Sequence, residues 1–480
     1  MKFTDIPSLS LSPGRLTVWR ARAPDRSTAA WAADPRRASH VQEALIAWAV
    51  EAAGEGPLPP SWLGCAFELP AELDANAFTT ALRYWANRHE TLRSHLVPSA
   101  SAAPEGGLQR VTLPAGAVSI QPSAAEDFAD GRQLARHLEA LFDGEAGPLA
   151  WPGYICTTIG GPEATTVCLA ADHSLVDGYS VCQTIYEIQT LYAAALAVHD
   201  GAPATSPLPP TASYLDFAEA ERTAADALTA DHEVIVRWRR FLAKGGGRLP
   251  EFPVPVSDLS HSPGAQAGGR SELLDASAAR AFDRACRAAG GDSASGLLAC
   301  FAKVGHELTG SDEFRTMVPI NTQTSAWQSS LGWYVGMAPV AFLLSATDSF
   351  AEAVRSAFSA FDGAKALART PMPRVAELLG HPLRDPFMIS YMDTRRTRGA
   401  RDWNRWRSVA LRSRCNDPDE VCLWIARTHD GLFIDYRHPA TGPAGIAVSH
   451  YVECTKHLLV AVASTGCWPP APHPAGDRLP

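Results

Sequence analysis

The sequence predicts a mixed α/β (α+β) fold that is divided into two domains. Helical and strand-like hydrophobic patterns alternate in both halves of the chain. The chain has 480 residues, whereas a single domain commonly holds about 100–200. A proline-rich stretch, residues 201–213, is typical of a stiff connector between domains. We therefore expect an N-terminal lobe over residues 1–205 and a C-terminal lobe over residues 206–480.

The first half contains alternating helices and strands. Helices are predicted where apolar residues recur every three or four positions, and strands where short apolar runs are bounded by turn residues. The predicted helices span residues 41–53, 74–86, 132–142 and 180–199. The predicted strands span residues 62–69, 91–97, 118–121, 153–159 and 165–171, and the last two pair across a turn at residues 160–162.

The second half is of the same mixed kind. It opens with a helix that ends near Leu242, and a long Gly- and Pro-rich loop follows over residues 245–269. The end of the chain, residues 469–480, is expected to fray. Further helices are predicted over residues 276–289 and 294–309, and strands over residues 314–319, 337–344, 387–392, 421–428 and 431–436.

Composition and charge exclude several classes of protein. With 46% apolar and 19% charged residues, the chain can build buried cores and is not disordered as a whole. The net charge is −9, whereas nucleic-acid binding normally requires a basic balance or basic stripes. The arginines between Arg395 and Arg412 come closest to such a stripe, and an exposed loop explains them.

Cysteine spacing and the N-terminus indicate a reducing compartment. The ten cysteines form no Cys-x-x-Cys pair, and the nearest pair, Cys415 and Cys422, has no histidine at ligand spacing. We therefore expect neither a metal site nor a disulfide framework. The first residues lack the apolar core of a signal peptide. Apolar runs such as residues 337–346 fall short of the ~18 residues that a membrane-spanning helix needs, so we expect a cytoplasmic protein.

The segment with the strongest chemical signal is Ala170–Ser180, between a predicted buried strand and an amphipathic helix. Functional residues are often placed on loops between such rigid elements. His173 can act as a general base, because an imidazole titrates near neutral pH. Asp177 and Gly178 follow, and a glycine lets the backbone approach a ligand closely. From these residues alone, a hydrogen-bonded structural histidine beside an ordinary Asp-Gly turn explains the pattern equally well.

This segment resembles the His-His-x-x-x-Asp-Gly motif of the superfamily of condensation domains and CoA-dependent acyltransferases. Residues 88–96 resemble a second motif of condensation domains, Arg-His-Glu-x-Leu-Arg-Thr-x-Phe. The resemblance covers most of the chain, about residues 40–460, and the chain is most similar to free-standing polyketide-associated acyltransferases of actinobacteria. Further stretches that carry the resemblance are residues 13–19, 213–217, 249–255, 317–321, 331–340, 371–379 and 384–391.

The resemblance implies a fold and a reaction. The fold is two lobes, each like a chloramphenicol acetyltransferase subunit, that meet in a V shape with the active site in a tunnel between them. A bridging segment is expected over residues 317–345. The reaction is transfer of an acyl group from a thioester, acyl-CoA or an acyl carrier protein, to a hydroxyl group in lipid or natural-product biosynthesis. No bound cofactor is implied, since phosphopantetheine arrives as part of the donor, and we expect a monomer.

The resemblance also assigns roles to residues. His173 is the general base, and the backbone N–H of Gly178 is a candidate donor to the oxyanion. Asp177 is expected to hold the loop in shape through an ion pair with Arg88 or, as a second choice, Arg93. The expected substrate-binding residues are Asn321, Trp333, Tyr334, Ser390 and Tyr391.

Two positions depart from the family pattern. Asp172 occupies the first motif position, where many relatives have histidine, and Gly336 stands where condensation domains often have asparagine. Asp172 either tunes the charge of His173, because a nearby carboxylate favours imidazolium, or is a tolerated polar residue. Three alternatives stay open: an amide-forming condensation enzyme, a non-catalytic scaffold that recruits a partner, and a cyclisation domain, whose Asp-x-x-x-x-Asp spacing Asp172 and Asp177 match.

Overall fold

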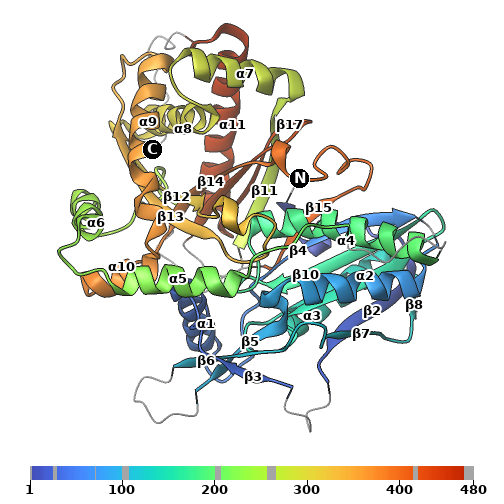
Figure 1. Ribbon diagram of the computed structural model, residues 1–480. Coiled ribbons are helices and arrows are strands. Elements are labelled where there is room, and N and C mark those ends of the chain that lie inside the picture. Colours follow the sequence, from blue (N-terminus) through green and yellow to red (C-terminus); the bar gives the residue numbers. More distant parts are fainter. Residues whose placement is uncertain are drawn as a thin grey trace. The chain divides into compact units, whose positions relative to one another are not determined.

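The computed structural model describes residues 3–24, 30–70, 72–99, 107–199, 207–256, 266–414 and 420–469. The chain forms two compact units (Figure 1). Each unit combines a β-sheet with packed helices, which confirms the mixed α/β class predicted from the sequence. The first unit comprises Met1–Ala227, Gln323–Tyr334 and Arg396–Cys415, and the second comprises Leu228–Thr322, Val335–Arg395 and Asn416–Pro480.

The first unit is built on an eight-stranded sheet in the order β1–β15–β4–β10–β9–β2–β7, with β8 also paired to β2. β10 lies inside the sheet and runs antiparallel to both of its neighbours, β4 and β9. A separate three-stranded sheet has the order β3–β6–β5. The strands are β1 (Phe3–Thr4), β2 (Gly14–Arg22), β3 (Ala32–Asp34), β4 (Trp62–Pro70), β5 (Ser94–Pro98), β6 (Leu108–Thr112), β7 (Ser119–Pro122), β8 (Glu126–Phe128), β9 (Tyr154–Gly160), β10 (Ala164–Asp172) and β15 (Val409–Arg412).

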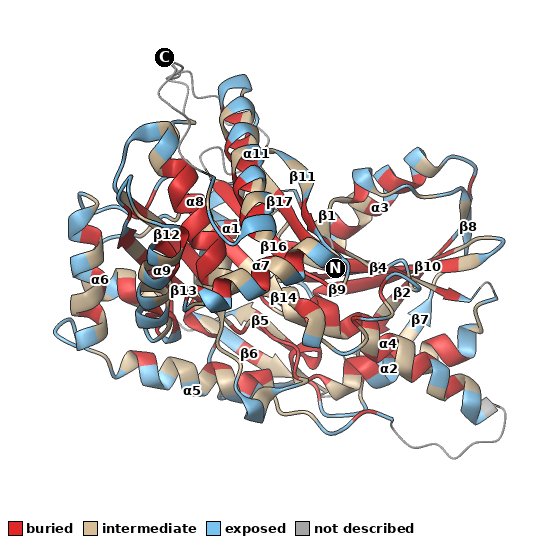
Figure 2. Cartoon of the chain, turned by 90° about the horizontal axis from the view of Figure 1, so that it is seen from above, coloured by how far each residue is buried: buried red, intermediate tan, exposed pale blue. Residues whose placement is uncertain are grey.

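Helices cover both faces of the large sheet. Side chains alternate between the faces of a strand, and Cys168 and Ala170 of β10 pack in one core with Leu138 and Phe142 of α3. α2 and α4 pack against each other and against strands of the same sheet. The strands between these helices are largely buried (Figure 2). The helices are α1 (His40–Ala53), α2 (Ala75–Arg88), α3 (Gly131–Glu145), α4 (Gly178–His199) and α5 (Tyr214–Asp226), with 3₁₀ turns at Ile6–Ser8, Glu90–Arg93 and Ser325–Trp327.

The second unit is built on a six-stranded sheet in the order β11–β17–β16–β14–β12–β13. On one side, α8 is buried along most of its length and packs against α7, α9 and α11. α6 and α10 form a second core with Met317 of β12. The elements are β11 (Gln266–Asp275), β12 (Glu313–Asn321), β13 (Val335–Leu343), β14 (Phe387–Asp393), β16 (Val421–Arg427), β17 (Gly431–Pro439), α6 (Glu233–Lys244), α7 (Ala276–Ala288), α8 (Ser293–Thr309), α9 (Phe350–Lys365), α10 (Met372–Leu379) and α11 (Gly442–Thr465), with a 3₁₀ turn at Leu367–Arg369 and another at Thr394–Arg396.

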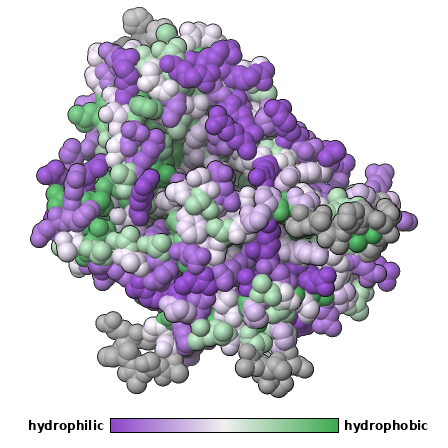
Figure 3. Space-filling model, in the orientation of Figure 1, coloured by the Kyte–Doolittle hydropathy of each residue, from purple (hydrophilic) through white to green (hydrophobic). Residues whose placement is uncertain are grey.

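The long helices are not of the membrane-spanning kind. None of the helices that the structure describes is long and apolar enough to cross a bilayer. Hydrophilic residues cover most of the face seen in Figure 3, and hydrophobic ones are interspersed among them. The apolar side chains of α8 and α11 are instead buried in the main core of the second unit.

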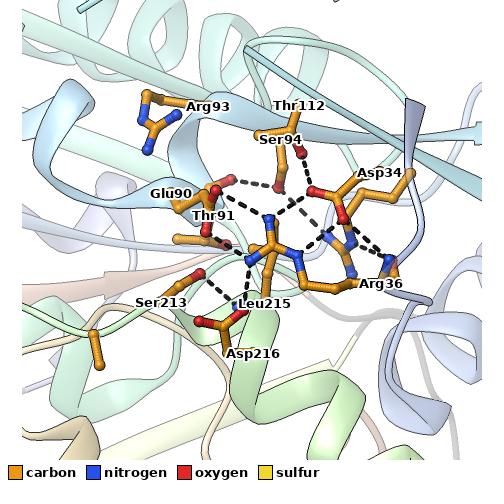
Figure 4. A network of polar contacts seen from close by, with 12 residues as sticks. Asp34, Arg36, Glu90, Thr91, Arg93, Ser94, Thr112, Ser213, Leu215 and Asp216 are labelled. Carbon is orange, nitrogen blue, oxygen red and sulfur yellow. Dashed lines mark hydrogen bonds and ion pairs between the residues drawn. The ribbon is translucent and has the colours of Figure 1, made fainter. Parts of the chain in front are cut away.

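The two units divide the chain differently from the predicted lobes of residues 1–205 and 206–480. α5 belongs to the first unit, where ion pairs hold it: Arg36 contacts Asp216 of α5 at 2.6 Å (Figure 4). Within the predicted bridging segment 317–345, residues 323–334 belong to the first unit, while β12 and β13 on either side belong to the second. Residues 200–206 of the connector and residues 470–480 lie outside the described residues.

Two further expectations need correction. The helix expected to end near Leu242 is in fact two helices, α5 and α6. Arg395, expected in an exposed loop, is held by carboxylates within the second unit, because its Nη1 donates to Asp283 at 2.9 Å and its Nε donates to Asp393 at 2.8 Å.

Candidate active site

The candidate site is built around His173, directly after the last residue of β10. Its backbone N–H donates to the carbonyl of Ser61 at 3.0 Å. Its ring Nδ1 lies 2.9 Å from the carbonyl oxygen of Val176. Because a carbonyl can only accept, we assign the ring proton to Nδ1, which leaves a lone pair on Nε2. The side chain is half-buried, and no group within the described ranges hydrogen-bonds to Nε2. This is the state that a general base requires.

One face of the imidazole is covered by Trp333. The two rings are stacked, with centroids 4.2 Å apart and planes inclined by 29°. Trp333 comes from residues 323–334, the segment that the first unit takes from the later part of the chain. The structure thus brings together two of the residues that the sequence analysis singled out, His173 and Trp333.

Asp177 fixes two elements at once. Its Oδ1 accepts the backbone N–H of Ser180 at 2.8 Å, which caps the first turn of α4. Its Oδ2 accepts the backbone N–H of Tyr334 at 3.0 Å, which fastens the end of segment 323–334 to the start of α4. The carboxyl group is 1% exposed. Burial raises its pKa, and the backbone N–H groups of Ser180 and Tyr334 act in the opposite direction.

The predicted ion pair between Asp177 and Arg88 or Arg93 is wrong. No ion pair joins these groups among the residues the structure describes, and the oxygens of Asp177 accept backbone N–H groups instead. Arg88 instead lies 3.1 Å, Nε to Oε1, from Glu187 on α4. Arg93 donates to the carbonyls of Asn87 and Leu113. Asp177 therefore keeps the structural role expected of it, with different partners.

Glu187 is the carboxylate to which the segment Arg88–Arg93 is bound. It is 2% exposed and accepts from His89 Nε2 at 2.6 Å as well as from Arg88. Burial alone would raise the pKa of Glu187, but the adjacent His89 and Arg88 together lower it below its usual range. On the other edge of the His89 ring, Nδ1 accepts the backbone N–H of Leu331 at 3.4 Å.

Glu90, in the same segment, binds a different part of the first unit, namely Arg36. It accepts two hydrogen bonds from Arg36, at 2.9 and 3.0 Å, and Arg36 also binds Asp34 and Asp216 (Figure 4). The Arg88–Arg93 segment thus links α4, α5 and the edge strand β3. The sequence analysis did not anticipate this role for His89, Glu90 or Glu187, although the first two stand inside the motif that it quoted.

Ser180 also escaped the sequence analysis. Its hydroxyl donates to the carbonyl of Gly332 at 2.9 Å and accepts the N–H of the same residue at 3.1 Å. Gln183, one turn further along α4, donates to the carbonyl of Ser329 at 2.5 Å. The signal available in the sequence was a pair of polar side chains, Ser180 and Gln183, three residues apart in the first turns of the predicted helix.

Asp172 closes the other side of the loop. Its Oδ1 accepts the backbone N–H of Ser174 at 2.9 Å, and its Oδ2 accepts the hydroxyl of Ser61. The residue is fully buried, and burial raises its pKa. One oxygen braces the loop itself and the other binds it to Ser61, which precedes β4, so the geometry favours a structural role for this departure from the family pattern.

Gly178 is the first residue of α4. The first N–H groups of a helix have no partner within it and carry the positive end of the helix dipole. In the described part of the chain, the N–H of Gly178 meets no acceptor. Its expected role as a donor to the oxyanion stays a prediction.

The other predicted substrate-binding residues are Tyr334, Asn321, Ser390 and Tyr391. Tyr334 is 1% exposed, donates from its hydroxyl to Ser330 at 2.8 Å and packs on Tyr214, so its surface is used for packing, and its expected role in binding substrate stays a prediction. Asn321 ends β12, and Ser390 and Tyr391 lie on β14, all in the second unit. Their role stays a prediction.

Side chains that could bind a metal ion do not cluster in the described residues. No cluster of three or more His, Cys, Asp or Glu side chains with metal-binding geometry occurs in the described ranges. The chemistry of this site is that of a histidine, a buried carboxylate and backbone N–H groups.

The sequence model of the Condensation domain family matches residues 62–386. The chain belongs to this family. The family resemblance carried by the His173 and Arg88 motifs is thereby confirmed. Solved structures agree on the fold: a PapA2 acyl transferase has a TM-score of 0.84 at 22% identity, with 96% of this chain and 100% of that chain covered. The first condensation domain of the calcium-dependent antibiotic synthetase has a TM-score of 0.65 at 18% identity, with 90% and 97% covered.

Two relatives carry functional names. Acyltransferase PapA3 of Mycobacterium tuberculosis is 26% identical over 411 residues, with 83% of each chain covered. The 2'-acyl-2-O-sulfo-trehalose (hydroxy)phthioceranyltransferase PapA1 of the same organism is 30% identical over 351 residues, which cover 71% of this chain and 64% of that protein. Together they confirm the predicted enzyme class, an acyltransferase similar to polyketide-associated enzymes.

Proposed function

We propose that this protein transfers an acyl group from a thioester donor to a hydroxyl group, with His173 as the general base. The observation that carries this proposal is the hydrogen bond from Nδ1 of His173 to the carbonyl of Val176. In the neutral imidazole this bond leaves the lone pair on Nε2, and this nitrogen is the one that can accept a proton from an incoming hydroxyl.

The reaction needs no covalent intermediate on the enzyme. The acceptor hydroxyl gives its proton to Nε2 of His173 while its oxygen attacks the thioester carbonyl carbon. The carbonyl π bond opens, and a tetrahedral oxyanion forms. The oxyanion then collapses, the C–S bond breaks, and the imidazolium returns the proton to the leaving thiolate. The products are an ester and a free thiol, and His173 returns to its starting state.

The oxyanion requires a donor that is fixed before the reaction begins. The N–H of Gly178 is our candidate, because it stands at the start of α4 and no described group accepts its proton. Asp177 supports this N–H indirectly by capping the same helix turn. A thioester carbonyl is already electrophilic, so we propose that no bound cofactor takes part and that phosphopantetheine, if present, belongs to the donor.

The relatives favour a hydroxyl acceptor over an amine. PapA1 is named for acyl transfer to an acylated sulfo-trehalose, and a further relative, PapA2 of Mycobacterium tuberculosis, is named a trehalose-2-sulfate acyltransferase at 26% identity. Trehalose offers hydroxyl groups and no amine. Amide formation is the second candidate, because the first condensation domain of the calcium-dependent antibiotic synthetase shares the fold. A scaffold without activity is disfavoured, because His173 and the Asp177–Gly178 pair are intact.

Acyl transfer by the purified protein tests this proposal. The donors are octanoyl and palmitoyl groups, each on coenzyme A and on an acyl carrier protein, and the acceptors are trehalose and glucosamine. We expect thiol release that depends on the acceptor, together with a product whose acyl group mild alkali removes, as it does from an ester. An alkali-stable product from glucosamine alone would indicate amide formation. No acceptor-dependent release with any donor would contradict an acyltransferase.

A further inference from the structure

The orientation of His173 depends on more than its hydrogen bond. A histidine side chain rotates about two bonds, and the bond from Nδ1 to the Val176 carbonyl restrains one edge of the ring. That bond alone permits the ring to tilt about the N–O axis. Trp333 lies against the flat face of the ring, 4.2 Å between centroids, and so restrains the remaining motion.

Trp333 is itself held by its neighbours in the chain. Gly332 is bound through both its N–H and its carbonyl to the hydroxyl of Ser180, at 3.1 and 2.9 Å. Tyr334 is bound through its N–H to Asp177 at 3.0 Å. The backbone on each side of Trp333 is therefore fastened to the first turn of α4, the helix that begins directly after the loop of His173.

Close packing explains why residue 332 is glycine. A Cβ atom at this position would lie 2.2 Å from a ring carbon of Tyr214, so any side chain would push the backbone away from Tyr214. The backbone lies close enough for both hydrogen bonds to Ser180 only because this atom is missing. Backbone contacts with Ser180 and Asp177 thus fix the chain on both sides of Trp333, and the indole, which also packs against the cluster around Tyr214, covers the imidazole.

We propose that Trp333 is a positioning residue for His173, which holds the imidazole so that Nε2 points to the acceptor hydroxyl. This inference rests on the proposed function and deepens it. It differs from the role that the resemblance implied, in which Trp333 binds substrate. Loss of a positioning residue lowers kcat, whereas loss of a residue that only lines the binding site chiefly raises KM.

Three variants separate these roles. Trp333→Phe keeps a flat ring against His173, and Trp333→Leu keeps an apolar side chain that cannot stack. Trp327→Leu is the matched control, because Trp327 belongs to the same segment but packs edge-on against Phe217, at 5.8 Å between centroids. Urea unfolding of all three shows whether the segment is still in place.

The first measurement is kinetic, with the donor and acceptor that the panel above turns over fastest. We expect kcat of Trp333→Leu to fall roughly 10- to 100-fold, since misplacing a catalytic group by about 1 Å can cost about 100-fold. We expect the KM for the donor to change less than about threefold, and Trp333→Phe to retain most of kcat. Trp327→Leu should match the wild type. A kcat for Trp333→Leu within about twofold of the wild type, or a loss confined to KM, would overturn the proposal.

The second measurement does not depend on turnover. Histidine ring nitrogens labelled with ¹⁵N report which nitrogen carries the proton, and His173→Gln identifies the signals of His173. The wild type and Trp327→Leu should show a single form with the proton on Nδ1, and Trp333→Leu a mixture of both forms. Unchanged signals in Trp333→Leu would show that the indole does not position the ring. A mixture in a protein that turns over no donor would instead retain the positioning role while the proposed function fails.

Discussion

Two polar clusters of the first unit hold their surroundings in different ways. At the loop of His173, Asp177 and Ser180 bind backbone groups of residues 332–334, which do not titrate. In the Arg88–Arg93 segment, charged side chains bind other charged side chains, as in the pairs Arg88–Glu187 and Glu90–Arg36. The comparison teaches that Asp177 and Ser180 beside the base bind main-chain groups, whereas the neighbouring Arg88–Arg93 segment is held by ion pairs between side chains.

The largest effect is expected from breaking the buried ion pairs. Glu187→Ala leaves Arg88 and His89 buried without their carboxylate, which commonly costs about 3–5 kcal/mol of unfolding free energy. Glu219→Ala is the control, because its partner Arg37 is 45% exposed and such pairs contribute roughly 0–1 kcal/mol. Urea unfolding of both variants measures the difference. Equal losses of unfolding free energy would show that the buried pairs of Glu187 stabilise the fold no more than the exposed pair of Glu219 does.

A smaller loss of stability, accompanied by a loss of activity, is expected at Asp177. Asp177→Ala removes a helix cap, which is worth about 0.5–2 kcal/mol, and leaves the N–H of Tyr334 without an acceptor. Asp177→Asn should be intermediate, because an amide offers one acceptor oxygen where the carboxylate offers two.

A double-mutant cycle with Arg88→Ala tests the corrected partners of Asp177. We predict costs that add to within about 0.5 kcal/mol, because the two side chains share no contact. A larger coupling free energy would indicate that Asp177 and Arg88 form the ion pair that the sequence analysis expected.

The smallest effect is expected in the pH dependence of the charged cluster. Burial tends to raise the pKa of Asp34, but hydrogen bonds from Arg36 and Thr112 outweigh it and lower the pKa to about 2. A carboxyl group with a lowered folded pKa adds stability above its unfolded pKa and loses it as the pH falls through the folded value. The stability advantage of wild type over Asp34→Asn should therefore shrink between about pH 4 and pH 2.

The pKa of Asp177 is shifted in the opposite direction from the pKa of Asp34. Burial raises its pKa, so the stability linked to its protonation is present at low pH and is lost as the pH rises through the folded value. Urea midpoints at several acidic pH values measure the contribution of Asp34. A difference between wild type and Asp34→Asn that does not change with pH would contradict the assignment of a lowered pKa to Asp34.

Much of the fold could be predicted from local patterns. The helix predicted over residues 132–142 is α3, Gly131–Glu145, and the paired strands predicted at residues 153–159 and 165–171 are β9 and β10. Each has a clear period and clear boundary residues. α11 and β15 were not predicted: exposed apolar residues such as Ile446 and Val460 weaken the hydrophobic period of α11, and β15 is a four-residue strand paired with the distant β4.

The site was predictable in its chemistry and less so in its contacts. The motif identified His173, Asp177 and Gly178 because residue types and spacing are local properties of the sequence. The partners of Asp177 could not be predicted, since they are backbone N–H groups, which every residue possesses. Trp333 and Ser180 lie more than 150 residues apart, and only the folded chain brings their segment and helix together.

The most direct test of the account is the single-turnover rate of acyl transfer in wild type and His173→Ala, with the acyl donor saturating and the folding of both proteins matched. The account predicts a loss of roughly 100- to 10,000-fold in His173→Ala, which is the usual contribution of a general base. It also predicts that the donor still binds to the variant. A well-folded His173→Ala that transfers acyl groups at the wild-type rate would contradict the central claim.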